Sequence, residues 1–314
     1  MIKFQGKHKS GFTVDLPVSP FTFPAGEAHI KGLDALDVTD YDYFITDIRG
    51  HNPQDLFHAT LFVDGVSELD FEAGVSSEHY LLLPYLPAAR ADRGTPFGAR
   101  TYASFINSLD YDAVFYIDPH SPVMPENLVG PIEYPFERII KQHIQDGSSD
   151  SKPQPYVGVI APDKGAVGRA TRAATVMGVP VYTAGKTRYF ETGQLTGFHM
   201  EDELPKEGKF LLVDDICDGG GTFIGLAEAI KETNPDVKLD LWVTHGVFSK
   251  GEKGLKDLTD RFDVIHTTNS YADTSLVQWS SPGLERRLRT GLIKVHDITP
   301  HLYSEVVRVD AGRN

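Results

Sequence analysis

The sequence predicts an α/β protein made of two similar halves, each with a mostly parallel sheet flanked by helices. Short β-rich runs alternate with helical stretches, and this alternation indicates βαβ units and parallel strands. A polar stretch rich in structure breakers, at residues 145–153, separates the two series. The length of 314 residues also fits about two domains of ordinary size. We therefore expect one domain at residues 1–146 and another at residues 147–314.

Each expected element depends on a local pattern of apolar residues. Runs rich in β-branched and aromatic residues predict strands, which in chain order are residues 43–46, 79–84, 113–117, 156–160, 179–182, 210–213, 239–243 and 264–265. Apolar residues at helical spacing predict helices at residues 98–109, 166–177 and 223–230. The order of these elements repeats in both halves, so the fold class does not depend on any one of them.

Composition and charge exclude several classes of function. The chain has 30 lysines and arginines against 44 aspartates and glutamates, a net charge of −14 with histidine neutral. A nucleic-acid partner is not expected, because binding its backbone requires a basic surface. The apolar runs are too short to span a membrane, and the first residues lack the apolar core of a signal peptide. We expect a cytoplasmic protein. A single cysteine, Cys217, excludes an intrachain disulfide.

The most informative stretch follows the apolar run at residues 210–213. Asp214 and Asp215 come directly after it, residues 219–221 are three glycines, and Thr222 opens the next predicted helix. Glycines let a backbone approach a ligand closely, and N–H groups at a helix N-terminus attract anions. Thr222 is placed to cap that helix or to bind a phosphate oxygen. The acids suit sugar hydroxyls or Mg²⁺ at the carboxyl end of a strand.

The run Asp-Asp-Ile-Cys-Asp-Gly-Gly-Gly-Thr at residues 214–222 resembles the phosphoribosyl-diphosphate loop of type I phosphoribosyltransferases and ribose-phosphate pyrophosphokinases. Other segments resemble ribose-phosphate pyrophosphokinases in the same order, namely residues 23–27, 84–93, 117–120, 161–170, 186–188 and 244–249. The resemblance covers roughly residues 20–250. It favours a pyrophosphokinase, because an ordinary phosphoribosyltransferase does not need the first half. It implies two phosphoribosyltransferase-like, Rossmann-like domains with the active site between them.

The resemblance also implies roles for single residues. The catalytic residues would be Lys186, Arg188 and His120. The acceptor would be held by Asp214, Asp215, Asp218, Gly219, Gly220, Gly221 and Thr222. ATP would be held by Phe23, Glu27, Arg90 and Asp92. Mg²⁺ would be bound by His120 and Asp163. The family transfers the β,γ-diphosphate of ATP to an anomeric hydroxyl and releases AMP, and its members assemble as dimers or hexamers, so a homo-oligomer is expected.

One departure from the family pattern bears on the acceptor. The family loop ends in Thr-Gly-Gly-Thr, and this chain has Gly219 in place of the first threonine. The change loses a hydroxyl donor and is expected to open space around the 5-phosphate. The acceptor is therefore either ribose 5-phosphate or ADP-ribose, which serves NAD synthesis in divergent phage-type members. Two further alternatives stay open: a catalytically silent regulatory homologue, and a phosphoribosyltransferase that uses phosphoribosyl diphosphate.

Overall fold

The computed structural model describes the chain except for residues 51, 89, 146–155, 189–194, 272–291 and 314. It forms two compact units. Unit 1 contains Met1–Tyr134, Ser270–Ala272 and Thr299–Asn314, and unit 2 contains Pro135–Asn269 and Asp273–Ile298. The chain first passes from unit 1 to unit 2 between Tyr134 and Pro135, whereas the predicted domains, 1–146 and 147–314, divide within a stretch that lies outside the described residues. The C-terminal helix, α8 (Thr299–Arg313), belongs to unit 1 because it contacts two strands of that unit.

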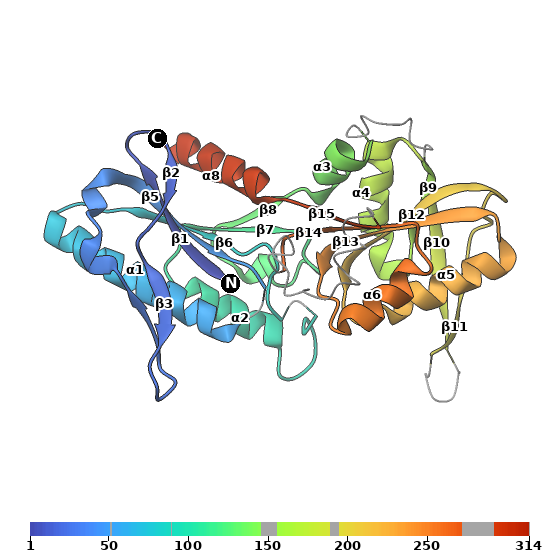
Figure 1. Cartoon of the computed structure of the whole chain (residues 1–314), viewed down its shortest axis with the longest axis horizontal. Coiled ribbons are helices and arrows are strands. Elements are labelled where there is room, and N and C mark those ends of the chain that lie inside the picture. The colour runs from blue at the N-terminus through green and yellow to red at the C-terminus, as the bar shows by residue number, and fades with distance from the viewer. Residues whose placement is uncertain (51, 89, 146–155, 189–194, 272–291, 314) are drawn as a thin grey trace. The chain divides into compact units, whose positions relative to one another are not determined.

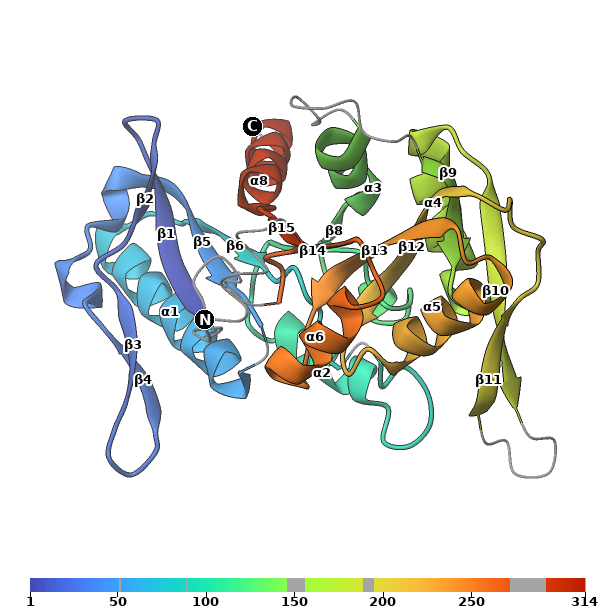
Figure 2. The ribbon, with the colours of Figure 1, turned by 45° about the vertical axis from the view of Figure 1, so that its right-hand side comes forward.

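Unit 1 is built on a six-stranded sheet in the order β2-β1-β5-β6-β7-β8. The strands are β1 (Ile2–His8), β2 (Thr13–Asp15), β5 (Tyr41–Ile48), β6 (Glu78–Leu82), β7 (Ala113–Ile117) and β8 (Pro131–Tyr134). β5 to β8 are parallel, while β1 and β2 are antiparallel at one edge. A separate hairpin, β3 (Ser19–Thr22) with β4 (Ala28–Lys31), projects away from this sheet (Figures 1 and 2).

Helices cover both faces of the unit 1 sheet. Figure 1 shows α1 (Pro53–Ala73) and α2 (Gly98–Asn107) on one face and α8 on the other. α1 begins where the Asn52 side chain accepts a hydrogen bond from the N–H of Gln54, and it ends at Gly74 with a φ of 67°. The sequence did not predict α1, because buried polar residues interrupt its apolar stripe. These residues are Asp55, His58 and Asp70.

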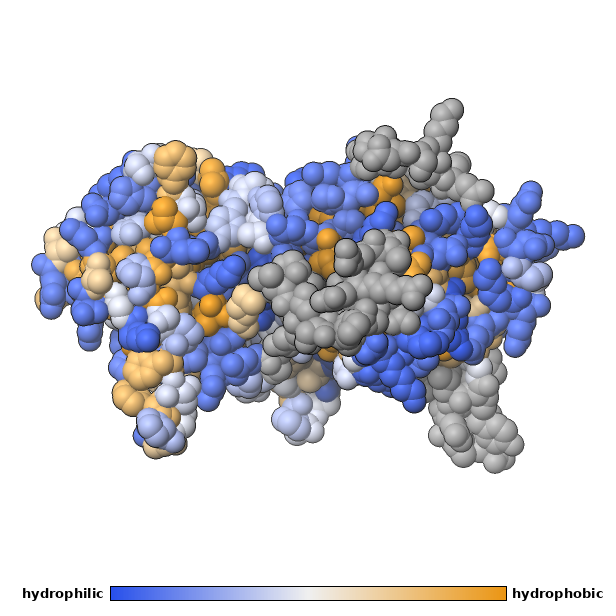
Figure 3. Space-filling model, in the orientation of Figure 1, coloured by the Kyte–Doolittle hydropathy of each residue, from blue (hydrophilic) through white to orange (hydrophobic). Residues whose placement is uncertain are grey.

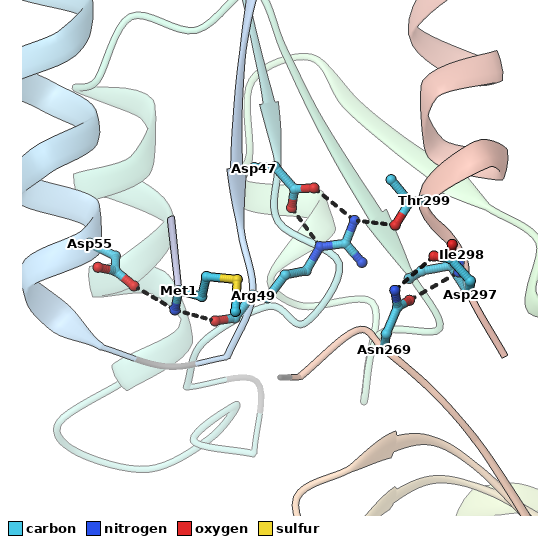
Figure 4. Close-up of polar contacts among 8 residues, drawn as sticks. All are labelled: Met1, Asp47, Arg49, Asp55, Asn269, Asp297, Ile298 and Thr299. Atoms are coloured by element: carbon cyan, nitrogen blue, oxygen red, sulfur yellow. Dashed lines mark hydrogen bonds and ion pairs between the residues drawn. The ribbon is translucent and has the colours of Figure 1, made fainter. Parts of the chain in front are cut away.

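A buried ion pair ties α8 to the end of β5 (Figure 4). Arg49 Nε donates to Asp47 Oδ1 at 2.5 Å, and its Nη2 donates to Asp47 Oδ2 at 2.8 Å. The same Nη2 donates to Thr299 Oγ1 at 3.4 Å. Both members of the pair are buried, at 5% and 6% exposure. The two-pronged contact with Asp47 holds the Arg49 guanidinium in place, and its single, longer hydrogen bond to Thr299 links the first residue of α8 to the sheet.

Unit 2 is built on a seven-stranded sheet in the order β11-β10-β9-β12-β13-β14-β15. The strands are β9 (Tyr156–Ala161), β10 (Val181–Arg188), β11 (Leu195–Met200), β12 (Gly208–Cys217), β13 (Val237–Gly246), β14 (Val264–Thr268) and β15 (Ile293–His296). All neighbours are parallel except β10 and β11. β12 is longer than predicted because it continues through Asp214 and Asp215.

The unit 2 sheet also lies between two helical layers (Figures 1 and 2). One layer contains α3 (Phe136–Ile140) and α4 (Val167–Met177), and the other contains α5 (Gly221–Thr233) and α6 (Gly251–Thr259). Leu226, Ile230 and Leu255 pack on buried strand residues to form the core. The prediction of two mostly parallel sheets flanked by helices is confirmed. Among the described helices, none is both long and apolar enough to span a lipid bilayer.

Candidate functional site

The glycine-rich turn between β12 and α5 leaves the first turn of a helix without a side-chain cap. The N-cap residue is Gly220, with a left-handed φ of 75°, and no side chain accepts a hydrogen bond there. No side chain caps the first N–H groups of α5, and helix N-termini of this kind bind anions. The expectation that Thr222 caps the helix is wrong, because α5 already begins at Gly221. Thr222 lies in the first turn and stays a predicted phosphate ligand.

Asp214 and Asp215 share one arginine. Arg169 Nη1 lies 3.4 Å from Asp214 Oδ1 and 3.7 Å from Asp215 Oδ1. The Asp215 N–H also donates to Asp214 Oδ1 at 2.9 Å. Burial and the adjacent charge of Asp215 outweigh Arg169 and raise the pKa of Asp214 to about 8. Asp214 is thus protonated over a pH range in which an ordinary aspartate is charged.

Asp163 and Lys186 form an ion pair one strand away. Lys186 Nζ donates to Asp163 Oδ2 at 2.6 Å, and Asp163 Oδ1 accepts from the N–H groups of Gly165 and Ala166. Burial works to raise the pKa of Asp163, but the hydrogen bond and charge of Lys186 and these two N–H groups lower it overall. The side chain of Arg188, at the end of β10, lies outside the described residues.

The topology brings these groups to one edge of the unit 2 sheet. β9 lies between β10 and β12, and all three run parallel, so their carboxyl ends share an edge. Asp163 follows β9, Lys186 lies near the end of β10, and the acid pair and the glycine turn end β12. Open parallel sheets bind ligands at this edge.

A lysine lies where a side chain on Gly219 would be. A Cβ atom added to Gly219 would lie 3.1 Å from Lys250 Cε and 3.6 Å from Lys250 Nζ. Lys250 follows β13, whose loop runs beside the glycine turn through a hydrogen bond from the Ser249 N–H to the Asp218 carbonyl. The space expected from the loss of the threonine is therefore taken by Lys250.

In unit 1, the predicted residues Arg90, Asp92 and His120 lie beyond the carboxyl ends of β6 and β7, which are parallel neighbours. Arg90 and His120 are exposed, and the Asp92 side chain is 20% exposed. The two loops contain left-handed backbone at residues other than glycine, with a φ of 53° at Ala88 and 43° at the buried Asp118. Such strain gathers at functional sites.

The other two predicted ATP residues, Phe23 and Glu27, lie in the turn of the β3–β4 hairpin. The Phe23 N–H donates to the Glu27 carbonyl at 2.9 Å, and the Phe23 ring, 45% exposed, contacts Phe21 with 4.8 Å between centroids. Figure 3 shows hydrophobic atoms exposed on this hairpin. Within unit 1, the structure places these two residues on the hairpin and the other three at the end of the sheet.

Known proteins of one family resemble the chain over most of its length. Residues 131–276 match the phosphoribosyl transferase domain. The ribose-phosphate pyrophosphokinase of Pyrococcus abyssi is 30% identical over 245 residues, which cover 73% of this chain and 76% of that protein. The chain belongs to the ribose-phosphate pyrophosphokinase family. The Pyrococcus furiosus ribose-phosphate pyrophosphokinase is 28% identical over 79% of this chain and 84% of its own. It follows that the chain is a diphosphotransferase.

The fold of the chain is also similar to that of a solved phosphoribosylpyrophosphate synthetase. The phosphoribosylpyrophosphate synthetase of Mycobacterium smegmatis superposes with a TM-score of 0.71 over 95% of this chain and 92% of its own, at 21% identity. Phosphoribosyltransferase-type domains thus account for both halves. Sequence reasoning did not give Arg169 a role, although the residue belongs to the run at 161–170 that resembles the family. That run is the signal that pointed to it.

Proposed function

We propose that this ribose-phosphate pyrophosphokinase transfers the β,γ-diphosphate of ATP to the anomeric hydroxyl of ribose 5-phosphate and releases AMP. The arrangement at the end of β12 carries this proposal. Asp214 and Asp215 offer acceptors for the ribose hydroxyls, and the uncapped first turn of α5 offers N–H donors for the 5-phosphate. Asp218, Gly219, Gly220, Gly221 and Thr222 complete the proposed acceptor site.

The proposed reaction transfers one diphosphate group. The anomeric hydroxyl oxygen attacks the β-phosphorus of ATP and loses its proton to solvent, the bond from that phosphorus to the α,β-bridging oxygen breaks, and AMP leaves with the bridging oxygen. Phosphoryl transfer depends mainly on positioning and charge neutralisation. Lys186 supplies a cation that Asp163 holds at 2.6 Å. We assign the same role to Arg188, whose guanidinium suits two-pronged phosphate contacts.

The described residues form no metal site of their own, so we propose that the metal arrives with ATP. Both Asp163 oxygens already accept hydrogen bonds, and within the described residues no three histidine, cysteine, aspartate or glutamate side chains gather as a metal site. Mg²⁺ commonly binds through substrate phosphates and only one or two carboxylates. We propose Asp163 and His120 as its protein ligands. When bound, Mg²⁺ would neutralise charge on the ATP phosphates.

ATP is assigned to the first half of the chain. We propose that Arg90 and Asp92 act with His120 from the loops after β6 and β7, and that Phe23 and Glu27 act from the hairpin. The exposed ring of Phe23 suits stacking on adenine. In a homo-oligomer, a dimer or hexamer, this ring would serve a neighbouring subunit. We propose residues 1–146 as the ATP part of the chain and residues 147–314 as the acceptor part, although the C-terminal helix α8 packs in unit 1.

ADP-ribose is a second candidate acceptor, and Gly219 is the observation that favours it. The residue lacks the hydroxyl that would contact a terminal 5-phosphate, and Lys250 Nζ lies 3.6 Å from the position of its missing Cβ. The diphosphate of ADP-ribose spreads its negative charge over two groups, and an ammonium group on a flexible stem suits such spread charge better than a single hydroxyl does. The product would be ADP-ribose pyrophosphate.

The test is to incubate the full chain with Mg-ATP and each acceptor and to follow AMP and the diphosphorylated product. We expect AMP release that depends on an acceptor, and the better acceptor by kcat/KM identifies the substrate. Without AMP release from either acceptor, the chain is a silent homologue and the proposal fails. If the protein instead consumes phosphoribosyl diphosphate and a base and releases diphosphate, it is a phosphoribosyltransferase.

A further inference from the structure

We infer that Lys250 binds the phosphate group on C5 of the acceptor and replaces the hydroxyl that Gly219 lacks. The inference rests on the proposed function, since it names a further ligand of the same site. It starts from the position of one side chain. Lys250 lies at the N-terminus of α6, outside the run at residues 214–222, and its Cε and Nζ lie beside the glycine turn.

Two glycines make room for this side chain. A Cβ atom on Gly254, one turn along α6, would lie 2.7 Å from Lys250 Cβ, and one on Gly219 would lie 3.1 Å from Lys250 Cε. Both distances are shorter than ordinary carbon contacts. The stem of the exposed Lys250 therefore lies close against both glycine positions, where a side chain would displace it. This placement directs its ammonium group toward the turn that holds the proposed phosphate.

The charge of Lys250 is placed against the usual electrostatic preference. It is the N-cap residue of α6, with no side-chain cap bond, and its ammonium group also lies near the N-terminus of α5. Helix N-termini favour anions and disfavour cations, and N-cap positions favour serine, threonine, aspartate and asparagine. Local rules are broken in this way where function requires it. An anion bound between the two helix N-termini removes the conflict.

The ammonium group is also available. No hydrogen bond or ion pair of Lys250 Nζ is found within the described parts of the chain. By contrast, Lys186 and Arg169 are held by Asp163 and by the acid pair. A phosphate bound at the first turn of α5 would thus gain a charge-assisted hydrogen bond without breaking an existing pair.

The test compares Lys250→Ala with Lys253→Ala, which removes the same charge from an exposed position on the same helix. Binding of ribose 5-phosphate and of ADP-ribose to the full chain is measured by calorimetry, and KM values are measured in the AMP-release assay. For Lys250→Ala we expect the acceptor Kd and KM to rise about tenfold, the effect of one charge-assisted hydrogen bond. The KM for ATP is expected to stay unchanged. For Lys253→Ala the acceptor Kd should change less than about twofold.

Two further measurements separate this role from a structural one. The Tm of Lys250→Ala is expected to equal or exceed the wild-type value, because the variant removes a cation from a helix N-terminus. Gly219→Ala should weaken acceptor binding in the wild type and have a smaller effect in the Lys250→Ala background, where nothing remains for the new methyl group to displace.

Each outcome decides the inference. Equal acceptor Kd values for Lys250→Ala and Lys253→Ala overturn it while the proposed function stands, provided that the wild type releases AMP. A wild type that binds ribose 5-phosphate but releases no AMP removes the proposed reaction and still tests Lys250 through binding. A wild type that binds neither acceptor at millimolar concentration overturns both.

Discussion

Replacing Asp214 by asparagine should stabilise the protein and weaken acceptor binding at the same time. The structure buries Asp214 beside Asp215, with one arginine between them at 3.4 and 3.7 Å. The pKa of Asp214 is raised from 3.8 to about 8, first by burial and then by the charge of Asp215. Between these two values, the native chain holds a proton that the unfolded chain releases, so stability falls as pH rises through this window.

The magnitude follows from the shift. One pKa unit corresponds to about 1.4 kcal/mol, and the Asp214 side chain is only 19% exposed, so solvent screening is limited. We expect Asp214→Asn to raise the free energy of unfolding on the order of 2–4 kcal/mol at pH 7 and about 1 kcal/mol at pH 5. Acceptor KM should rise about tenfold or more, because the amide nitrogen takes the place of a carboxyl oxygen and cannot accept a hydrogen bond from a ribose hydroxyl.

The assay is urea unfolding at pH 7 and pH 5. Arg169→Met is measured beside it, because we expect this variant to change the free energy of unfolding in the opposite direction. Removal of Arg169 leaves both acids without their shared cation, so Arg169→Met should be destabilised at pH 7 by about 2 kcal/mol and recover part of this loss at pH 5. An Asp214→Asn variant that is less stable than the wild type at pH 7 would refute the reasoning. So would a gain that is the same at both pH values.

Three further predictions use other parts of unit 2. Lys186→Met is expected to lower kcat about 100-fold, while Lys164→Met, which removes a lysine whose side chain is 83% exposed, leaves kcat within about twofold. His296→Gln should reduce acid sensitivity: burial and the neighbours His266 and His143 lower the pKa of His296 from 6.5 to about 3. Between these two pKa values only the unfolded chain holds the proton, so the stability of the wild type falls as the pH falls. Urea unfolding between pH 7.5 and pH 5 should therefore show a loss of unfolding free energy that is about 2 kcal/mol smaller in the variant than in the wild type. Gly220→Ala places a Cβ 3.3 Å from Leu258 at a φ of 75° and should lower the free energy of unfolding by about 1–2 kcal/mol. Gly74→Ala, at a φ of 67° with nothing within 4 Å, is its control, and only Gly220→Ala should raise acceptor KM.

The sequence was most informative where chemistry depends on adjacent residues. The run at residues 214–222 is local, so its acids, its glycines and the helix that follows were all predictable from order and spacing. The N-cap residue of that helix was not predictable, because it depends on the backbone conformation of Gly220. The arginine that the acids share was not predictable either, because Arg169 precedes Asp214 by 45 positions and two strands, β10 and β11, lie between them in the sequence.

The missed elements have equally specific causes. α1 contains the buried residues Asp55, His58 and Asp70, which disrupt the apolar period that identifies a helix. The predicted strand at residues 210–213 stopped at the first carboxylate, although β12 runs to Cys217. β15 has only four residues, and two of them, Lys294 and His296, are polar, so the sequence contains no apolar run that would predict this strand. In each case a polar residue with a structural or chemical role interrupts the pattern.

A net charge of −14 is compatible with anionic substrates because the charge of a site is set by placement. At the edge of the unit 2 sheet, acids hold the cations: Asp163 binds Lys186, and the acid pair binds Arg169. These pairs fix the positions of long side chains before any ligand arrives, which lowers the entropy lost on binding. They also neutralise each cation in the free protein. The inferred role of Lys250 follows from this balance: a phosphate needs a cation that no carboxylate already holds, and the two glycines beside Lys250 provide its place.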